Sequence, residues 1–417
     1  TNGYRVVPVG RLSIGHESLN HKLFVFRYSA EDNTYLGGSS WLSSGESFDV
    51  YAGEKVRFVL AYTDNAEISP DAEIPPIYIT AEHGIADTSV ITGLPVLRLS
   101  GDISEMTKET KVNLTYSIFG KTGTCTCKWQ GSSSLRYPKK NFTIAAMDPA
   151  IDAWSLWAKW VNSWRSQTGN ISRVSTESKW GIRNKYCLKA NWIDPSAMRN
   201  IVCARLWEQV VASRNQVIGN LEEAPNYGAI DGFPVCLMIN NSFAGLYTFN
   251  VPKDAYTFSM GEGSAEYVVS GESNSAQSCR WKATAKGSGE DGDDYEIVCS
   301  PDGVDNSIVI TSLNAAIAKA VASHADWETE CGDYSDIEAL MDYFIFGNCV
   351  GAHDNLARNV LYGTYDGQKW FMSAYDLDTT FGSDPYGSSW FETVNDRNQF
   401  KEAAAMHRLC HLRSEEH

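Results

Sequence analysis

Long apolar runs are missing from this sequence of 417 residues. No stretch approaches the roughly 18 consecutive apolar residues that a membrane-spanning helix needs. The first residues also lack the charged start and apolar core of a secretory signal peptide. We therefore expect no membrane span, and we expect the protein to be made in the cytoplasm.

Positive charge is scarce as well. Lys and Arg number 35 against 51 Asp and Glu, which gives a formal net charge of −16 at pH 7. Such a chain is poorly suited to bind nucleic acid or an anionic membrane surface, because both attract cations. We expect no nucleic-acid partner, although a small local group of lysines could still bind a nucleotide phosphate.

The ten cysteines do not show the spacing of a metal site or of a disulfide framework. Only Cys125 and Cys127 lie close together, and no second pair completes a zinc-binding pattern. Cys203, Cys236 and Cys349 lie inside apolar runs, where buried free thiols are expected. The cysteines therefore fit a protein made in a reducing compartment, without a structural zinc ion.

What is present indicates an α+β protein with more than one domain. Apolar residues make up 43% of the sequence, and a chain of this length is expected to hold two or three domains. Residues 1–90 show short alternating runs typical of a small β-sandwich module. Residues 91–390 mix strand and helix patterns, and a Gly- and Ser-rich stretch at 262–306 predicts a surface insertion. Residues 391–417 form a C-terminal tail.

The clearest predicted helix covers residues 194–214. Asp194 is placed to be its N-cap and Pro195 its first helical residue. Further helices are predicted at about 310–323 and at 336–351. The last of these leads directly into the most polar segment of the chain.

That segment, residues 351–382, reads GAHDNLARNVLYGTYDGQKWFMSAYDLDTTFG. Two strand-like runs flank Asp366-Gly367, a dipeptide typical of a tight hairpin turn. The outer ends of such a hairpin meet, which would bring together Asp354, Asn359, Asp376 and Asp378. Carboxylate and amide oxygens are ligands that Mg²⁺ prefers, and phosphoryl transfer needs such a cation and a proton-accepting carboxylate. The alternative is a hairpin whose polar ends only cap turns.

A second group of candidates lies in WQGSSSLRYPKKNFTI, residues 129–144. Gly131 with Ser132, Ser133 and Ser134 could form a backbone cradle for phosphates. Lys139 and Lys140 open the next strand, where a lysine could reach those phosphates. The alternative is a solvated turn with two surface lysines.

The helix at 194–214 offers two charged candidates. Glu208 could orient a strand lysine, as a helix acid does in kinase sites. Arg199 could pair with a carboxylate or reach a phosphate. The alternatives are a solvated glutamate and a structural ion pair.

Four segments in this order resemble the spore coat protein H (CotH) kinase family. They are WQGSSSLRYPKKNFTI, KYCLKANWIDPSAMRNIVCARLW, GFPVCLMINNSFAGLYTFNVPKD, and MDYFIFGNCVGAHDNLARNVLY with KWFMSAYDLDTTFG, and together they cover roughly residues 95–390. The resemblance implies an atypical protein-kinase-like domain with two lobes. It also implies binding of ATP with Mg²⁺, or with Mn²⁺, and phosphorylation of Ser or Thr on a protein substrate.

The resemblance assigns a role to each acid of the hairpin. Asp354 corresponds to the catalytic-loop aspartate and Asn359 to its metal partner. Asp376, with Asp378 beside it, corresponds to the metal-loop acid. The usual kinase metal loop has Asp directly before Phe-Gly, whereas two threonines intervene here.

The resemblance also assigns the nucleotide contacts. Lys139 or Lys140 would hold the phosphates, and residues 250–253 would line the adenine side.

The segments WQGSSSLRYPKKN and LKANWIDPSAMRN also look like CotH-type proteins encoded in phage and prophage tail gene regions. Within the N-terminal module, residues 26–70 are similar to small β modules of phage tail and baseplate-associated proteins. This implies an alternative function as a structural tail, fibre or baseplate component of a virion, with the kinase-like domain as a scaffold. The partners would then be tail proteins in a phage particle and not a phosphorylated substrate. A homo-oligomer fits either hypothesis.

Overall fold

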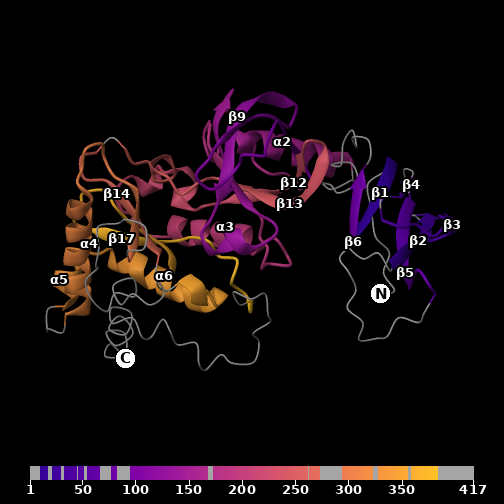
Figure 1. Cartoon of the computed structure of the whole chain (residues 1–417). Coiled ribbons are helices and arrows are strands. Elements are labelled where there is room, and N and C mark those ends of the chain that lie inside the picture. Colours follow the sequence, from indigo (N-terminus) through magenta and orange to yellow (C-terminus); the bar gives the residue numbers. More distant parts are fainter. Residues whose placement is uncertain are drawn as a thin grey trace.

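The computed structural model describes residues 10–16, 21–29, 32–44, 46–50, 54–65, 77–81, 94–167, 172–261, 263–272, 294–322, 327–355 and 358–383 (Figure 1). Within these residues several sheets combine with few helices, so the predicted α+β class is confirmed. The finer prediction of two kinase-like lobes stays a prediction. None of the described helices is long and apolar enough to cross a membrane.

Two small antiparallel sheets form the N-terminal part. β1 (Gly10–His16) lies between β4 (Ser47–Val50) and β6 (Ile77–Ala81), and β2 (His21–Ser29) lies between β3 (Tyr35–Gly38) and β5 (Glu54–Tyr62). One hydrophobic cluster takes Leu12 from the first sheet and Leu23 and Val56 from the second. Each sheet therefore buries one face in a shared core. The sandwich form and the boundary at residue 90 stay predictions, and residues 82–93 lie outside the described residues.

A closed barrel follows, with the strand order β10-β11-β13-β12-β7-β8-β9 (Figure 1). Its strands are β7 (Val96–Ser100), β8 (Val112–Ile118), β9 (Lys121–Gln130), β10 (Asn141–Asp148), β11 (Tyr186–Lys189), β12 (Gly232–Ile239) and β13 (Ser242–Asn250). β7 and β12 pair in parallel, and the other neighbours are antiparallel. Because β9 also pairs with β10, the barrel has no free edge.

Aromatic side chains fill the part of the core that α2 (Ala153–Gln167) covers. Trp157 and Trp180 each stack on Phe233, with ring centroids 5.5 and 5.6 Å apart. Phe233 in turn stacks on Phe249 at 5.5 Å. Trp180, Phe233 and Phe249 are fully buried, so this part of the barrel is a packed core.

The helix α3 (Arg199–Ala212) begins later than the sequence predicts. Its N-cap is Met198, and Asp194 instead begins a turn in which the N–H of Ala197 donates to the Asp194 carbonyl at 3.0 Å. Ala197 has a left-handed φ of +53°, which ends any helical path from Pro195. The predicted N-cap is therefore wrong, although the Asp194 carboxylate still accepts a bond from the Arg199 N–H at 2.9 Å.

A second sheet has the order β15-β14-β16-β17. Its strands are β14 (Tyr267–Glu272), β15 (Tyr295–Cys299), β16 (Arg358–Thr364) and β17 (Trp370–Ala374). Figure 1 shows α4 (Asn306–Val321) and α5 (Trp327–Gly332) at the end of this sheet that is far from the barrel. α6 (Ile337–Val350) lies closer to the barrel. α6 packs against β17.

Part of the predicted surface insertion at 262–306 belongs to the core. β14 lies between β15 and β16, and Val268 and Val269 are fully buried. The Gly- and Ser-rich composition between the two strands hid this pairing, because it resembles that of a loop. Residues 273–293 lie outside the described residues.

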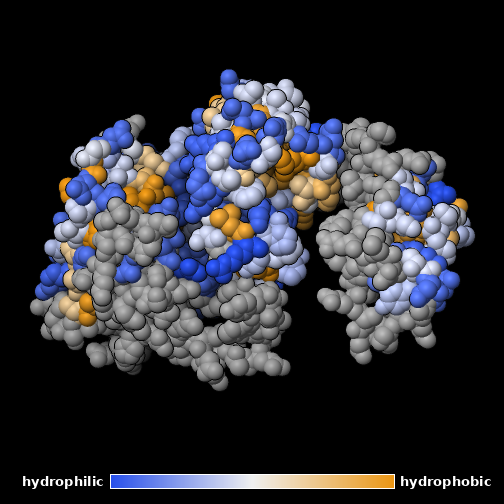
Figure 2. Space-filling view, viewed as in Figure 1, coloured by the Kyte–Doolittle hydropathy of each residue, from blue (hydrophilic) through white to orange (hydrophobic). Residues whose placement is uncertain are grey.

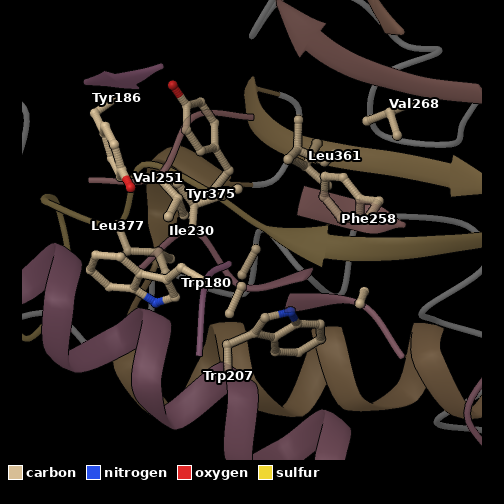
Figure 3. Close-up of a cluster of buried hydrophobic side chains, with 14 of the residues drawn as sticks. Trp180, Tyr186, Trp207, Ile230, Val251, Phe258, Val268, Leu361, Tyr375 and Leu377 are labelled. Atoms are coloured by element: carbon tan, nitrogen blue, oxygen red, sulfur yellow. The ribbon is translucent and has the colours of Figure 1, made fainter. Parts of the chain in front are cut away.

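Trp207 of α3 joins the barrel side of the molecule to this second sheet. Its ring centroid lies 5.2 Å from that of Phe346 and 5.8 Å from that of Tyr343, both on α6. Its indole N–H donates to the Ser373 hydroxyl of β17 at 3.1 Å. Figure 3 shows Trp207 in the buried cluster that also holds Tyr375 and other labelled side chains. The strand that leads to the candidate acids is thus anchored to α3.

The described surface is mostly hydrophilic on the face shown in Figure 2, with small separate hydrophobic patches. This agrees with the acidic composition of the chain.

Candidate functional site

The predicted hairpin is confirmed by the pairing of β16 and β17. The two strands are antiparallel, with Val360 opposite Ala374. In the turn, Asp366 accepts backbone N–H bonds from Gln368 at 2.8 Å and from Lys369 at 2.7 Å. The residues at the open end of the hairpin therefore lie next to one another.

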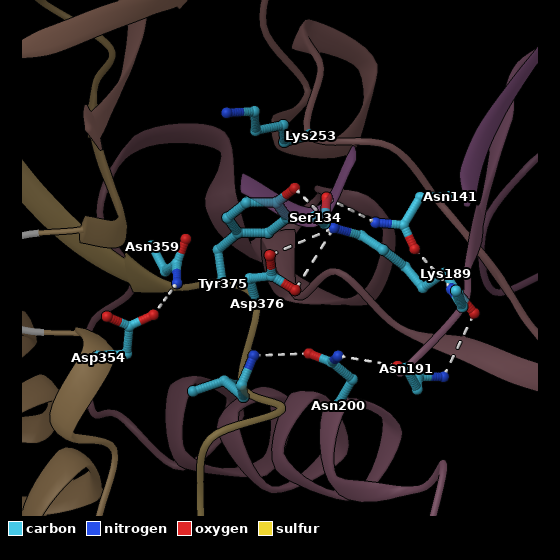
Figure 4. Close-up of polar contacts among 12 residues, drawn as sticks. Ser134, Asn141, Lys189, Asn191, Asn200, Lys253, Asp354, Asn359, Tyr375 and Asp376 are labelled. Carbon is cyan, nitrogen blue, oxygen red and sulfur yellow. Dashed lines mark hydrogen bonds and ion pairs between the residues drawn. The ribbon is translucent and has the colours of Figure 1, made fainter. Parts of the chain in front are cut away.

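Asp354 and Asn359 form a pair at this open end. Asp354 lies in η5 (His353–Asn355), a short helix after α6, and Asn359 lies in β16. Nδ2 of Asn359 donates to Oδ2 of Asp354 at 3.0 Å (Figure 4). Asn359 has a φ of +56°, a conformation that Asn adopts more readily than most residues. Because its amide nitrogen faces Asp354, its amide oxygen is the atom left to face a cation.

Asn355 links this pair to β17. Its buried side chain donates from Nδ2 to the carbonyl oxygens of Asn359 at 2.9 Å and of Tyr375 at 2.6 Å. The loop that carries Asp354 is therefore fixed to the strand end that precedes Asp376. Sequence reasoning missed Asn355, because only the fold shows that its side chain bridges two segments.

The lysine that reaches Asp376 is Lys189, the last residue of β11. Its ammonium lies 3.4 Å from both carboxylate oxygens of Asp376 and 3.2 Å from the Tyr375 hydroxyl (Figure 4). Burial acts to lower the pKa of Lys189, but the Asp376 carboxylate, together with the bond to the Tyr375 hydroxyl, outweighs it and raises that pKa overall. The site thus holds a lysine that is both buried and charged.

Lys139 and Lys140 are turned to backbone carbonyls instead. The Lys139 ammonium donates to the carbonyl oxygens of Ala190 and Leu246, and burial lowers its pKa to about 8. Lys140 donates to two carbonyl oxygens of its own loop at 2.7 and 2.6 Å. The double lysine is a conspicuous pattern in the sequence, whereas Lys189 is a single lysine at the end of a buried strand. The sequence signal for Lys189 is its position in KYCLKANWID, part of one of the four segments that carry the family resemblance.

The loop between β9 and β10 lies next to the residue that follows the site lysine. Asn141, the first residue of β10, accepts a bond from the Ala190 N–H at 2.6 Å. The Asn141 amide nitrogen donates to the Ser134 hydroxyl at 3.3 Å. The loop backbone is therefore held beside the end of β11.

Gly131 is required by the shape of this loop. Its φ is +120°, and a Cβ atom there would lie 2.0 Å from the Ser134 Oγ. Ser132 is exposed, and the side chain of Ser133 lies outside the described residues. A phosphate-binding role for this loop stays a prediction.

Arg199 and Glu208 both have structural partners. The Arg199 guanidinium pairs with Asp194 and donates from Nε to the Thr380 carbonyl at 2.9 Å. It therefore fixes the loop after the hairpin acids to α3. Glu208 pairs with Lys179 at 2.5 Å and does not orient the site lysine, so that expectation is corrected.

Asp378 completes the group of acids. Protein surrounds most of its carboxyl group, so burial raises the pKa well above its usual range, and the carboxylates of Asp376 and Asp354 raise it further. Lys189 opposes this effect. Repulsion among carboxylates of this kind is relieved when a cation binds.

The donor set fits Mg²⁺ bound together with a nucleotide. Asp376 and Asp378 offer carboxylate oxygens and Asn359 an amide oxygen, all hard ligands. Across the part of the chain that the structure describes, no three His, Cys, Asp or Glu residues gather as a metal-binding cluster. Mg²⁺ commonly takes only one or two carboxylates and completes its shell with phosphate oxygens and water, so such a cluster is not required.

A comparison with family models finds that residues 127–409 match the family described as CotH kinase protein. The match covers more than half of the chain. This chain belongs to the CotH kinase family. No match was found among the curated proteins.

The CotH match contains every candidate residue of the site, from Gly131 to Asp378. It begins after β7 and β8, which complete the barrel, and after both N-terminal sheets. The predicted resemblance to the CotH family is therefore confirmed, while the phage-associated type stays a prediction.

Proposed function

We propose that this CotH family member is an atypical protein kinase that transfers the γ-phosphoryl group of ATP to a Ser or Thr hydroxyl of a protein. The observation that carries the proposal is the Lys189–Asp376 ion pair next to the Asp354–Asn359 pair. Phosphoryl transfer needs a cation to hold the phosphates, ligands for a metal ion, and a carboxylate near the attacking hydroxyl.

Each residue then has a distinct task. Asp354 orients the acceptor hydroxyl and takes up its proton, while the amide of Asn359 holds that carboxylate in place. Lys189 binds the nucleotide phosphates. Asp376, Asp378 and Asn359 would hold Mg²⁺, and the chemistry it would supply there is neutralisation of charge on the phosphoryl group.

Nucleotide binding tests this proposal. The purified chain should bind a fluorescent ATP analogue only with Mg²⁺ or Mn²⁺, and Asp376→Ala should weaken that binding by at least about tenfold, because a charged ligand is lost. Glu208→Gln is the control, since its partner Lys179 lies outside the site, and it should bind like the wild type.

Transfer is measured separately with γ-labelled ATP. Asp354→Asn should abolish labelling of the chain or of added protein while it keeps nucleotide affinity. A wild-type chain that neither binds ATP nor transfers phosphate with either metal would refute the kinase proposal.

A structural virion component is the second candidate. It is supported by the N-terminal sheets, which have their own hydrophobic cluster and lie outside the CotH match. In this role the protein would leave the cytoplasm in assembled phage particles and contact tail proteins. Mass spectrometry of purified particles would find the chain at a fixed ratio to known tail proteins, and its absence from them would exclude this role.

A further inference from the structure

Two buried asparagines connect the candidate site to the body of the protein. Asn191 follows β11 two residues after Lys189, and Asn200 lies in the first turn of α3 (Figure 4). Their exposed fractions are 8% and 7%. Buried amides need partners for both the oxygen and the nitrogen, so the identity of those partners is informative.

The partners form one continuous chain of hydrogen bonds. The backbone N–H of Leu377, between the two acids of the turn 376–378, donates to Oδ1 of Asn200 at 2.6 Å. Nδ2 of Asn200 donates to Oδ1 of Asn191 at 3.2 Å. Nδ2 of Asn191 lies 3.4 Å from the carbonyl oxygen of Lys189. The chain thus runs from the acid turn to the strand end that carries the site lysine.

The two ends of this chain fix the orientation of both amides. A backbone N–H can only donate, so Asn200 must turn its oxygen to Leu377 and its NH₂ group to Asn191. A carbonyl can only accept, so Asn191 must turn its NH₂ group to Lys189, which also places it 3.3 Å from the Thr248 hydroxyl. The two requirements agree with each other, and only side chains with one donor and one acceptor group satisfy them.

The backbone at both ends adopts conformations that need support. Asp376 has a φ of +52° and Asn191 a φ of +46°. Non-glycine residues keep such left-handed conformations where the surroundings hold them. The row of hydrogen bonds contacts Asn191 itself and Leu377, the residue that follows Asp376.

We propose that Asn191 and Asn200 form an amide relay that positions the 376–378 turn relative to Lys189, and so sets the affinity of the site for the metal-bound nucleotide. Both are positioning residues that act through the turn. The ligand named in this inference rests on the proposed function, whereas the relay itself rests on the contacts alone.

Hydrogen exchange tests the relay without any ligand. In the full chain, Asn200→Ala should speed up exchange of the amides at 376–378 by about tenfold, because Leu377 loses its acceptor. Asn191→Ala should have a similar effect, although Asn191 does not contact Leu377. Asn162→Ala is the matched control: its amide joins the N–H and carbonyl of Val174, each at 2.8 Å, and its loss should leave exchange at 376–378 unchanged.

The Mg²⁺ dependence of ATP binding tests the consequence. The half-saturating Mg²⁺ concentration should rise about tenfold in either single variant. Because the two amides act in series, the double variant should be no worse than either single one. Asn162→Ala should keep the wild-type Mg²⁺ dependence even if its melting temperature falls.

The outcomes separate this inference from the proposed function. Unchanged exchange at 376–378 in Asn191→Ala would overturn the relay even if ATP binds. If the two variants exchange faster at 376–378 but the wild type binds no ATP, the relay is supported. That result would refute both the proposed function and the nucleotide role given to the relay.

Discussion

Three lysines near the candidate site show how much a residue's role depends on its surroundings. Lys189 faces a carboxylate and stays charged in a buried position. Lys139 lies in a similar interior but faces carbonyl oxygens, and burial lowers its pKa. Lys140 donates to carbonyl oxygens of its own loop. In the sequence these three lysines look alike, and only the fold shows which of them has an acid as its partner.

Lys139 predicts a pH dependence of stability. Its pKa falls from an ordinary value of 10.5 to about 8 in the folded protein. Between these values the unfolded chain binds more protons than the folded one, so this lysine makes stability rise with pH. Its side chain is partly exposed, and screening limits the gain to about 1 kcal/mol.

The measurement is urea unfolding of the wild type and of Lys139→Met at pH 7.5 and pH 10. The free energy of unfolding of the wild type should rise relative to that of the variant at the higher pH. An equal change in both proteins would show that Lys139 titrates at its ordinary pKa.

At the scale of elements, the site depends on how α3 is attached to its neighbours. α3 contributes Asn200 and Arg199 to the loop after β17, and Trp207 to the packing against α6 and β17. The hairpin was predictable, because Asp366-Gly367 and the flanking apolar runs are local signals. The start of α3 was not, because the left-handed turn at Ala197 has no signal of its own.

Trp207 should therefore be important for stability. Trp207→Ala removes a fully buried indole and its bond to Ser373, and we expect the free energy of unfolding to fall by about 4 kcal/mol. Val202→Ala is the control on the same helix, because Val202 is 42% exposed, and its effect should stay within about 0.5 kcal/mol. Chemical denaturation measures both, and equal losses would contradict the assigned anchor role.

At the scale of the whole molecule, the family match and the barrel do not share a boundary. The match starts at residue 127, inside β9, whereas β7 and β8 begin at Val96 and Val112. Long-range pairing of this kind depends on tertiary contacts. The sequence patterns therefore predict individual strands, but they do not predict that these strands close into a barrel. The same reason explains why β14 was expected in a surface insertion.

Two shortened chains test where the folding unit begins. Residues 94–417 keep all strands of the barrel and should unfold cooperatively on heating. Residues 127–417 lose β7, whose Leu97 and Leu99 are fully buried, all of β8 and the first part of β9. The barrel interior is then exposed and the chain should aggregate. Circular dichroism and size-exclusion chromatography report the result, and a monomeric, cooperatively folded 127–417 chain would contradict it.

The parallel pair of β7 and β12 has a consequence for synthesis on the ribosome. Val96 is opposite Cys236, so the first strand of the barrel must wait for about 140 further residues before its neighbour is made. Until then β7 can pair only with β8, and its other edge stays open to strands of other nascent chains. The rate of translation through residues 100–239, and chaperones that cover open strand edges, should therefore influence how much of this protein reaches its native state.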